Sequence, residues 1–496
     1  MSEETAERGA DDRSDASGSG SDDPDGSANA DGDDNADAPS GSAALEHVLE
    51  TVRDRVDPDP DERDRLRKVA DRLAERAADA ATDRAPDADV VQVGSTARNT
   101  WISGDRDIDL FVRFPPELDR DTLEEYGLAV GHATLPDGHE EYAEHPYVKG
   151  TVEGFDIDVV PCFRLESATD IRSAVDRTPF HNSYLLERLD DDLAADVRLT
   201  KQFLKGIGVY GSDLRTRGFS GFLTELLVCE YGGFRPLLEA ARDWHPQVEL
   251  DPEDHGEASF DDPLVVIDPT DPERNVAAVC SSANVARLQH YAREFLEEPA
   301  IEYFEPDDPA SLSESQLQEH LKRRGTTPVA IRFDAPDLVE DQLYPQLRKS
   351  LDGVTTGLDD RGFDVFRATA MANDDGSNGH GLLFVELAVD ERPTVERHDG
   401  PPVHVKGHAE GFYDAYTADS DVYGPFIEGG RYVTERRREF TTARAFLESD
   451  RLFDVGLGAH VETALEDDYE VLVGDDVTAL LAEFGAELRR YFEPVP

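Results

Sequence analysis

The chain has 496 residues, a formal net charge of −60 and a pI of about 4.4, and this length suffices for two to four domains. The acids are spread along the whole chain and only seven lysines occur, which excludes an acidic interaction tail as the source of the charge. The pattern is typical of a halophile, because the Debye length in 1 M salt is about 3 Å and self-repulsion is screened. Three scattered cysteines without a CxxC pair exclude a disulfide framework, and no apolar run is long enough for a membrane span, so we expect a cytoplasmic protein without membrane contact.

The N-terminal segment is too polar to fold by itself. Residues 1–42 contain thirteen acids and two arginines but no aromatic residue, Leu, Ile or Val, so we expect disorder. Helical apolar spacing then runs from Ala43 to about Ala81 and is interrupted at Asp59-Pro60.

The most informative stretch is residues 90–111, VVQVGSTARNTWISGDRDIDLF. An apolar strand ends at Gly94, and the turn made by Gly94 and Ser95 exposes backbone N–H groups at the start of a short helix, which can hold a phosphate. On the next strand Asp107 and Asp109 share one face. Two adjacent carboxylates repel each other unless a cation lies between them, and hard oxygen ligands suit Mg²⁺. The combination predicts nucleotidyl transfer.

Gly-Ser followed by a spacer and two acids one residue apart resembles the signature of the polymerase-beta-like nucleotidyltransferase superfamily. The resemblance implies a third acid on a later strand. In residues 154–162, GFDIDVVPC, Asp156 and Asp158 share one strand face. Asp158, just before the Val-Val-Pro run, is our third metal ligand. Asp156 is the competing candidate, and its alternative role is a solvated acid at the strand end.

Further motifs resemble the archaeal CCA-adding enzymes, the class I tRNA nucleotidyltransferases, from about residue 45 to the C-terminus. These motifs are GSTARNTW, DIDLF, DVVPC, DRTPFH at 176–181, the segment 197–227, and DPTDPERNVA at 268–277. The resemblance implies template-independent addition and repair of the tRNA 3′-CCA end with CTP and ATP. The tRNA 3′-hydroxyl would attack the nucleotide α-phosphate and release pyrophosphate. Two Mg²⁺ ions, held by Asp107, Asp109 and Asp158, and a homodimer are also implied.

The nucleotide-binding residues are expected on several segments. They are Gly94, Ser95, Arg98, Thr178, His181, Lys201, Tyr210 and Arg274. The alternative role of Arg98 is a surface salt bridge. The alternative role of His181 is that of a surface residue at a helix N-terminus. Arg274, implied to read the base, has as its alternative a helix-cap salt bridge with Asp268 or Asp271.

The later elements follow from spacing. Residues 180–245 have helical periodicity, with Lys201 at the edge of the apolar stripe, where its side chain can reach a cleft at the domain boundary. A β-α-β-β order then suggests a ferredoxin-like or RRM-like module, with elements at 328–333, 341–358, 363–370 and 382–389.

The densest basic cluster follows GPFIEGG at 424–430. It consists of Arg431, Arg436, Arg437, Arg438 and Arg444. These arginines are predicted to bind the tRNA acceptor–TΨC minihelix, because A-form RNA is recognised through backbone shape and 2′-hydroxyls. The alternative is an exposed helix balanced by Glu435 and Glu439.

The expected fold class is multidomain α+β: a polymerase-beta-like nucleotidyltransferase palm of mixed sheet and helices, a helical central domain, and a C-terminal α/β RRM-like module with a tail. The expected domains are a disordered extension (1–42), the palm (43–178), the central nucleotide-binding domain (179–297), and a tRNA-binding region (298–496) with the module at about 326–392 and the tail at about 393–496. Alternative functions are a poly(A) polymerase or oligoadenylate synthase, which use ATP alone. An RNA-binding scaffold with an inactive transferase domain is disfavoured because all three acids are present.

Overall fold

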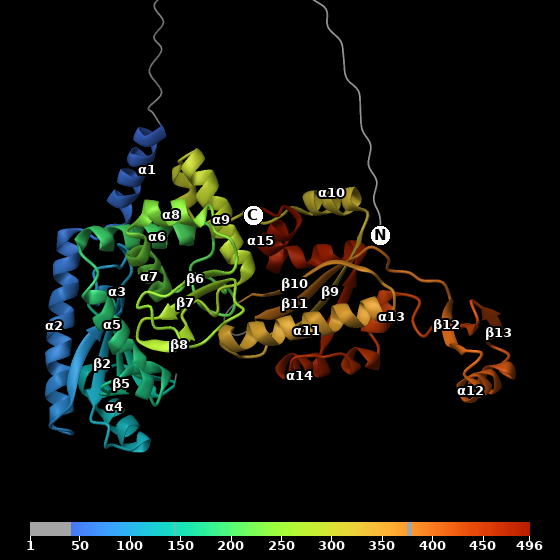
Figure 1. Ribbon diagram of the computed structural model, residues 1–496, viewed down its shortest axis with the longest axis horizontal. Coiled ribbons are helices and arrows are strands. Elements are labelled where there is room, and N and C mark those ends of the chain that lie inside the picture. The colour runs from blue at the N-terminus through green and yellow to red at the C-terminus, as the bar shows by residue number, and fades with distance from the viewer. Residues whose placement is uncertain (1–40, 143, 374–378) are drawn as a thin grey trace, which may run out of the picture. The chain divides into compact units, whose positions relative to one another are not determined.

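The computed structural model describes residues 41–142, 144–373 and 379–496 (Figure 1). The expected disorder of residues 1–42 falls outside this range except for its last two residues. No helix in the described part of the chain combines the length and apolar character that crossing a membrane requires.

The two N-terminal helices are α1 (Gly41–Val56) and α2 (Pro60–Thr82). The predicted break is confirmed: the Asp59 side chain accepts a hydrogen bond from the backbone N–H of Glu62, and Pro60 fills the first helical position. The two apolar stripes pack in different cores. The stripe of α1 joins the core of the central helices, and the stripe of α2 joins the core under the first sheet.

The palm is a mixed sheet, as expected. Its strands have the order β1-β2-β5-β4-β3, and only β2 and β5 among them run parallel. The strands are β1 (Asp89–Val93), β2 (Asp107–Phe114), β3 (His139–Tyr142), β4 (Pro146–Val152) and β5 (Phe155–Phe163). Helices α2 and α4 (Arg120–Thr134) share a core with one face of the sheet, into which Ile108, Leu110 and Val112 point. The acids of β2 therefore lie on the other face.

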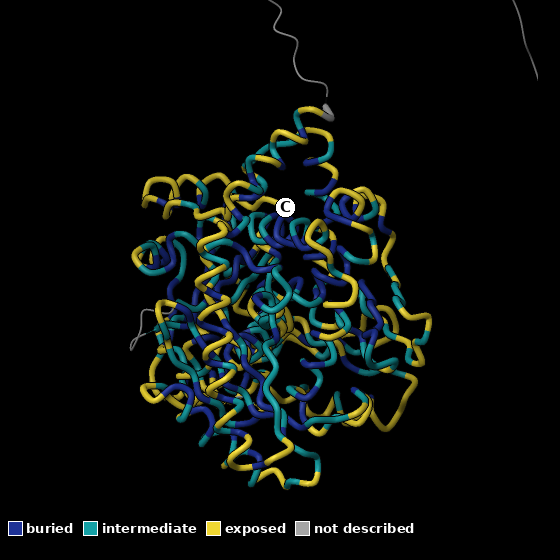
Figure 2. The backbone as a smooth tube through the Cα atoms, turned by 90° about the vertical axis from the view of Figure 1, so that its left-hand side faces the viewer, coloured by how far each residue is buried: buried dark blue, intermediate teal, exposed yellow. Residues whose placement is uncertain are grey.

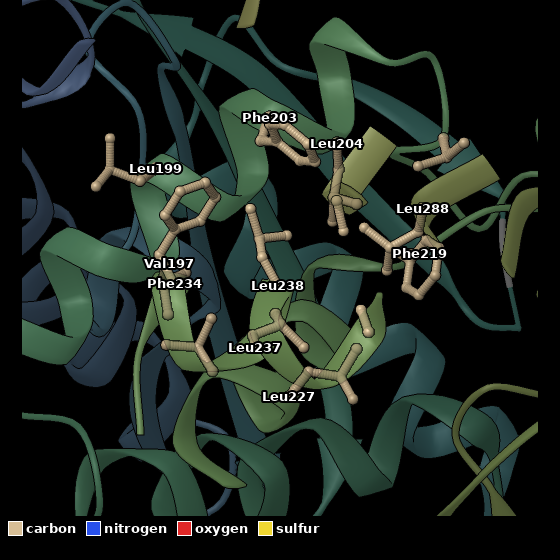
Figure 3. Packing of buried hydrophobic residues seen from close by; sticks show 14 of the residues in the cluster. Val197, Leu199, Phe203, Leu204, Phe219, Leu227, Phe234, Leu237, Leu238 and Leu288 are labelled. Atoms are coloured by element: carbon tan, nitrogen blue, oxygen red, sulfur yellow. The ribbon is translucent and has the colours of Figure 1, made fainter. Parts of the chain in front are cut away.

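The central helices surround a large apolar core (Figure 3). They are α5 (Thr178–Leu186), α6 (Asp191–Gly206), α7 (Gly221–Tyr231), α8 (Phe234–Ala241) and α9 (Ser282–Glu297). Short 3₁₀ turns flank this region at Ala168–Asp170, Ala174–Arg177 and Ile301–Phe304. Along the traces in Figure 2, buried and exposed positions alternate, as expected for amphipathic helices.

A small sheet that the periodicity did not indicate lies beside these helices. Its order is β6-β7-β8, with β6 (Val248–Leu250), β7 (Leu264–Asp268) and β8 (Asp271–Asn275). The tight β7–β8 hairpin brings Asp268 and Arg274 together, which matters for the site.

The β-α-β-β order in the C-terminal part is confirmed. The elements are β9 (Thr327–Asp334), α11 (Glu340–Asp360), β10 (Val365–Ala372) and β11 (His380–Leu387). The sheet order is β10-β11-β9-β15, and its fourth strand, β15 (Tyr469–Val473), comes from beyond the range 326–392 expected for this module. One face packs on α11, α13 (Ala443–Leu447), a 3₁₀ turn (Asp450–Asp454) and α14 (Ala459–Asp467). The other face packs on α10 (Glu314–Arg324), a 3₁₀ turn (Gly474–Leu480) and α15 (Leu481–Phe492).

A separate three-stranded sheet stands between β11 and α13 in the sequence. Its order is β12-β14-β13, with β12 (Val395–Pro402), β13 (Tyr423–Glu428), β14 (Arg431–Arg437) and the helix α12 (Lys406–Thr417). The alternative interpretation placed the arginine cluster on an exposed helix. It is wrong about the secondary structure, because Arg431–Arg437 form a strand.

Candidate active site

Four acids meet on one face of the palm sheet. Strands β2 and β5 are parallel neighbours, and their register pairs Asp107 with Asp156 and Asp109 with Asp158. Adjacent strands lie about 4.8 Å apart, so paired residues present their side chains next to each other on the same face. The structure thus brings Asp107, Asp109 and Asp158 together, and it places Asp156 beside them with a hydrogen bond from the Thr151 hydroxyl (2.9 Å).

Burial, more than the local charge, raises the pKa of these carboxylates. Burial, together with the neighbouring Asp158 and Asp107, raises the pKa of Asp109 to about 6. Burial also raises the pKa of Asp107 and of Asp158, and in both cases Lys149 opposes the rise. Lys149, which the sequence analysis missed, has its Nζ 3.4 Å from Asp158 Oδ1. The face is therefore an anionic patch to which a cation is attracted.

The carboxylates of Asp107, Asp109 and Asp158 lie on one face of the sheet but do not converge on a common metal position. Within the described ranges 41–142, 144–373 and 379–496, no three Asp, Glu, His or Cys side chains are arranged to hold a metal ion. Asp158 Oδ1 is buried, and the ion pair with Lys149 Nζ at 3.4 Å is its contact with a basic group. A buried oxygen with only this long contact, in a set of hard carboxylate ligands, fits a divalent cation such as Mg²⁺.

The Gly-Ser turn sits directly against these acids. Gly94 begins α3 (Gly94–Ala97) with φ +80°, and a Cβ at this position would collide with Asp109 Oδ2. Only glycine therefore allows the turn and Asp109 to approach so closely. The turn is followed by a loop that folds back on it, since the backbone N–H of Thr100 donates to Ser95 O at 3.0 Å.

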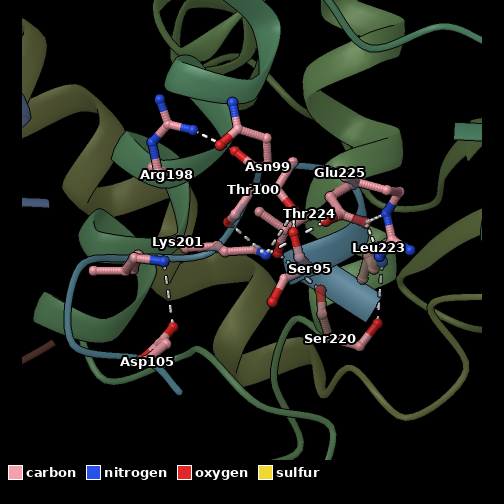
Figure 4. A network of polar contacts seen from close by, with 12 residues as sticks. Ser95, Asn99, Thr100, Asp105, Arg198, Lys201, Ser220, Leu223, Thr224 and Glu225 are labelled. Atoms are coloured by element: carbon pink, nitrogen blue, oxygen red, sulfur yellow. Dashed lines mark hydrogen bonds and ion pairs between the residues drawn. The ribbon is translucent and has the colours of Figure 1, made fainter. Parts of the chain in front are cut away.

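Lys201 reaches Glu225, a fully buried acid of α7 (Figure 4), and Arg98 pairs with the same carboxylate. Arg98 donates from Nε (3.0 Å) and Nη2 (2.7 Å) to Glu225 Oε2, and from Nη1 (2.8 Å) to Asn182 Oδ1. Lys201 Nζ donates to Thr100 O at 3.0 Å and lies 3.4 Å from Glu225 Oε1. The ion pair of Arg98 is thus buried rather than on the surface, and Lys201 reaches from α6 to the palm loop instead of into open solvent.

Glu225 was missed from the sequence although a signal for it exists. It is the one acid within the apolar run Leu223–Val228 of α7. A charged residue in a helix that is apolar all round is buried, and a buried charge needs a partner. Burial alone would raise the pKa of Glu225, but Lys201 and Arg98 outweigh it and lower the pKa, so the carboxylate is ionised.

A second buried acid, Asp268, contacts both His181 and Arg274. His181 Nε2 and Arg274 Nη1 each lie 2.8 Å from Asp268 Oδ2. Burial would raise the pKa of Asp268, but hydrogen bonds from His181 and Thr270 hold it well below its usual value. The His181 ring stacks on Phe222 of α7, with ring centroids 3.8 Å apart. The alternative role predicted for Arg274 was a helix-cap salt bridge with Asp268 or Asp271. The ion pair with Asp268 is present, but Arg274 lies on strand β8 and not at a helix cap.

The remaining predicted nucleotide ligands lie around these groups. Thr178 is the first residue of α5. Tyr210 pairs with Phe219 in an isolated bridge, and Lys205 Nζ lies 5.5 Å from the Tyr210 ring centroid. The Tyr210 hydroxyl lies at the start of α7, since a Cβ added to Gly221 would be 3.3 Å from it.

The tail arginines form a surface of their own. Arg431 Nε donates to Gly400 O at 3.1 Å. Arg436 and Arg438 both pair with Glu396, at 2.8 and 3.5 Å. A cavity of about 510 Å³ is lined by Asp360, Arg361, Glu396, Arg436, Arg437, Arg438, Glu439 and Phe440. Arg444 is engaged elsewhere, with Nη2 2.6 Å from Asp476 Oδ2 and Nη1 donating to Val471 O at 2.9 Å.

A Gly-Ser turn against two acids of one strand, with a third acid on the parallel neighbour in a mixed sheet, defines a nucleotidyltransferase. Three family models match: "Nucleotidyltransferase domain" at 73–181, "tRNA nucleotidyltransferase, second domain" at 195–305, and "CCA-adding enzyme, C-terminal domain" at 324–474. The chain belongs to the family of CCA-adding enzymes. Membership implies nucleotide substrates and the use of a divalent metal.

Curated relatives agree over nearly the whole chain. The CCA-adding enzyme of Halorubrum lacusprofundi is 64% identical, covering 91% of this chain and 99% of its own. That of Haloarcula marismortui is 60% identical, covering 92% and 100%. That of Methanoregula boonei is 44% identical, covering 88% and 93%. Among solved structures, a cytoplasmic RNA terminal U-transferase is 16% identical with a TM-score of 0.41, over 54% of this chain and 99% of that one, which is too distant to carry an argument.

Proposed function

We propose that the palm acids Asp107, Asp109 and Asp158 hold two Mg²⁺ ions for addition of CCA to tRNA. As a member of its family, the enzyme completes the 3′ end of tRNA with CTP and ATP and without a nucleic-acid template. When bound, the metal activates the 3′-hydroxyl and neutralises the triphosphate. The observation that carries the proposal is the side-by-side placement of Asp109 and Asp158 on parallel strands, where burial and repulsion raise the pKa of both.

The nucleotide lies, in this proposal, between the palm and α7. Gly94 and Ser95 receive the triphosphate through backbone N–H groups and the Ser95 hydroxyl. Arg98 and Lys201 stand behind that turn and supply positive charge, since together they exceed the single charge of Glu225.

The base and ribose contacts come from other elements. Tyr210 and Thr178 flank the ribose and phosphates. His181 and Arg274 face the base, and their shared contact with Asp268 fixes the direction of both side chains. A guanidinium held at one nitrogen keeps further N–H groups with which it can read a base edge.

For tRNA we propose that Arg431, Arg436, Arg437 and Arg438 bind the backbone of the acceptor–TΨC minihelix. Arg436, Arg437 and Arg438 share one cavity, which supports a common phosphate contact. Arg444 is the weakest member of the set, because Asp476 and Val471 O already engage its guanidinium. A homodimer is proposed on family resemblance, and light scattering in molar KCl tests it.

The experiment is extension of a 5′-labelled tRNA transcript that ends at the discriminator base, in Mg²⁺ and molar KCl. Two additions with CTP alone, and a third only when ATP is also present, are expected. The Asp107→Ala variant should be silent. Long A-only tails would contradict the assignment and indicate a poly(A) polymerase, and tRNA binding without extension would indicate a scaffold. Mg²⁺ titration by calorimetry, repeated on Asp109→Ala, tests the number of metal ions.

A further inference from the structure

The loop that follows the Gly-Ser turn is held by the central helices through three consecutive residues (Figure 4). Arg98 donates to Glu225 of α7, and the Thr100 hydroxyl donates to the same carboxylate. Between them, the backbone carbonyl of Asn99 accepts from Arg198 of α6. The palm loop that adjoins the proposed triphosphate contact Ser95 therefore takes its position from outside the palm.

Both oxygens of Glu225 are engaged, and each lies near two donor atoms. Oε2 accepts from Nε and Nη2 of Arg98, at 3.0 and 2.7 Å. Oε1 accepts from the Thr100 hydroxyl and lies 3.4 Å from Lys201 Nζ. Four donor atoms around two oxygens fix both the position and the orientation of the carboxylate. The fixed carboxylate in turn holds the side chains of Arg98 and Thr100 in place.

This cluster joins one carboxylate to two basic side chains and is shielded from solvent, where burial lowers the pKa of Lys201 and the charge of Glu225 opposes that fall. Glu225 has a fully buried side chain, and Arg98 and Lys201 expose 9% and 4% of theirs. A buried carboxylate is costly unless its partners compensate it, so Glu225 is held there by these two cations.

We infer that Glu225 is a positioning residue for nucleotidyl transfer, which holds the loop at Arg98 and Thr100 so that Ser95 faces the triphosphate. The link to Ser95 is direct, because the backbone N–H of Thr100 donates to Ser95 O at 3.0 Å. The inference rests on the proposed role of Ser95 as a triphosphate contact. Glu225 itself touches no substrate in this account and acts through the loop.

The test compares Glu225→Gln and Thr100→Val with Thr100→Ser, using full-length protein in molar KCl. Thr100→Val removes one hydroxyl donor at nearly constant shape, whereas Thr100→Ser keeps it. We expect Thr100→Val to raise the KM for CTP and for ATP about tenfold, the worth of one hydrogen bond to a charged group. Thr100→Ser should restore the wild-type KM. Glu225→Gln should raise KM further, and Glu230→Gln, the same change at an exposed position of α7, should not.

A merely structural role predicts a different pattern. It would lower the folded fraction seen by circular dichroism, and the affinities for CTP and for unphosphorylated cytidine would fall together. Positioning of the turn predicts a loss for CTP with cytidine binding unchanged. If Glu225→Gln does not fold, the two Thr100 variants decide alone, because they leave all three charges in place.

Ser95→Ala separates this inference from the proposal on which it rests. If Ser95→Ala leaves the KM for CTP unchanged, the proposed phosphate turn is wrong. If Ser95→Ala raises KM while Thr100→Val and Glu225→Gln match the wild-type enzyme, the turn stands and the positioning role of Glu225 is overturned.

Discussion

Replacing Gly94 by alanine is expected to damage catalysis far more than folding. The residue has φ +80°, a conformation that costs a side chain roughly 1–2 kcal/mol. An added Cβ would collide with Asp109 Oδ2 and lie 3.3 Å from Asp109 Cγ. The collision is with the end of a side chain, so Asp109 can turn away. The fold therefore tolerates the change, but Asp109 leaves its place beside Asp158.

The expected magnitudes follow from these two effects. The free energy of unfolding should fall by about 1–3 kcal/mol, from backbone strain and local overpacking. A shift of a reacting group by about 1 Å costs roughly 100-fold in rate. Single-turnover addition of CMP to tRNA should therefore slow about 100-fold, as measured by quenched-flow in molar KCl beside urea unfolding of the same sample.

Gly325→Ala is the matched control. Gly325 ends α10 with φ +66°, and no atom of the described residues comes within 4 Å of a Cβ added there. It should show a similar strain cost and full activity. The reasoning is refuted if Gly94→Ala extends tRNA at the wild-type rate, or if Gly325→Ala slows extension as much as Gly94→Ala does.

Three further outcomes are expected. Asp158→Asn should slow CMP addition about 1000-fold, since a metal ligand contributes several kcal/mol, whereas Asp156→Asn stays within a few-fold; equal losses would contradict the assignment of the third acid. Asp268→Asn should lower the free energy of unfolding by about 1–3 kcal/mol, because His181 and Arg274 lose their charged hydrogen-bond acceptor, and should raise the KM for both nucleotides. Arg437→Ala should raise the KM for tRNA but leave the KM for CTP unchanged. Arg444→Ala should lower the free energy of unfolding and leave the KM for tRNA and for CTP unchanged. The opposite result would mean that Arg444 binds tRNA and that Arg437 has a structural role.

Elements whose partners are close in sequence could be predicted from periodicity. The break at Asp59-Pro60, the strands around the acids and the β-α-β-β order all rest on local signals, and all are present. Strand β15 could not be predicted as part of the same sheet, because its pairing with β9 joins residues more than a hundred positions apart. The sheet of β6, β7 and β8 was missed because its strands have three to five residues, too few for a distinct period.

The site, like the fold, could be predicted only where the residues involved are close in sequence. Sequence spacing could place Asp107 and Asp109 on one face, since that needs only one strand. It could not indicate that Arg98 and Lys201 meet at Glu225, because the three residues come from α7, α6 and a palm loop. A partner for a buried charge is a tertiary property, and residue type alone indicates only that some partner must exist.

The distribution of lysine shows how so acidic a chain can bind a polyanion. Of seven lysines, three lie around the site: Lys149 is 3.4 Å from Asp158, Lys201 is 3.4 Å from Glu225, and Lys205 is 3.5 Å from Asp105. Salt screens exposed charges strongly but buried ones much less. A cation such as Lys201, sealed between α6, α7 and the palm loop, therefore keeps its field in molar salt. In the proposed function, binding of the triphosphate therefore depends on a few local basic groups, of which Lys201 is shielded from the solvent while Lys149 and Lys205 are partly exposed.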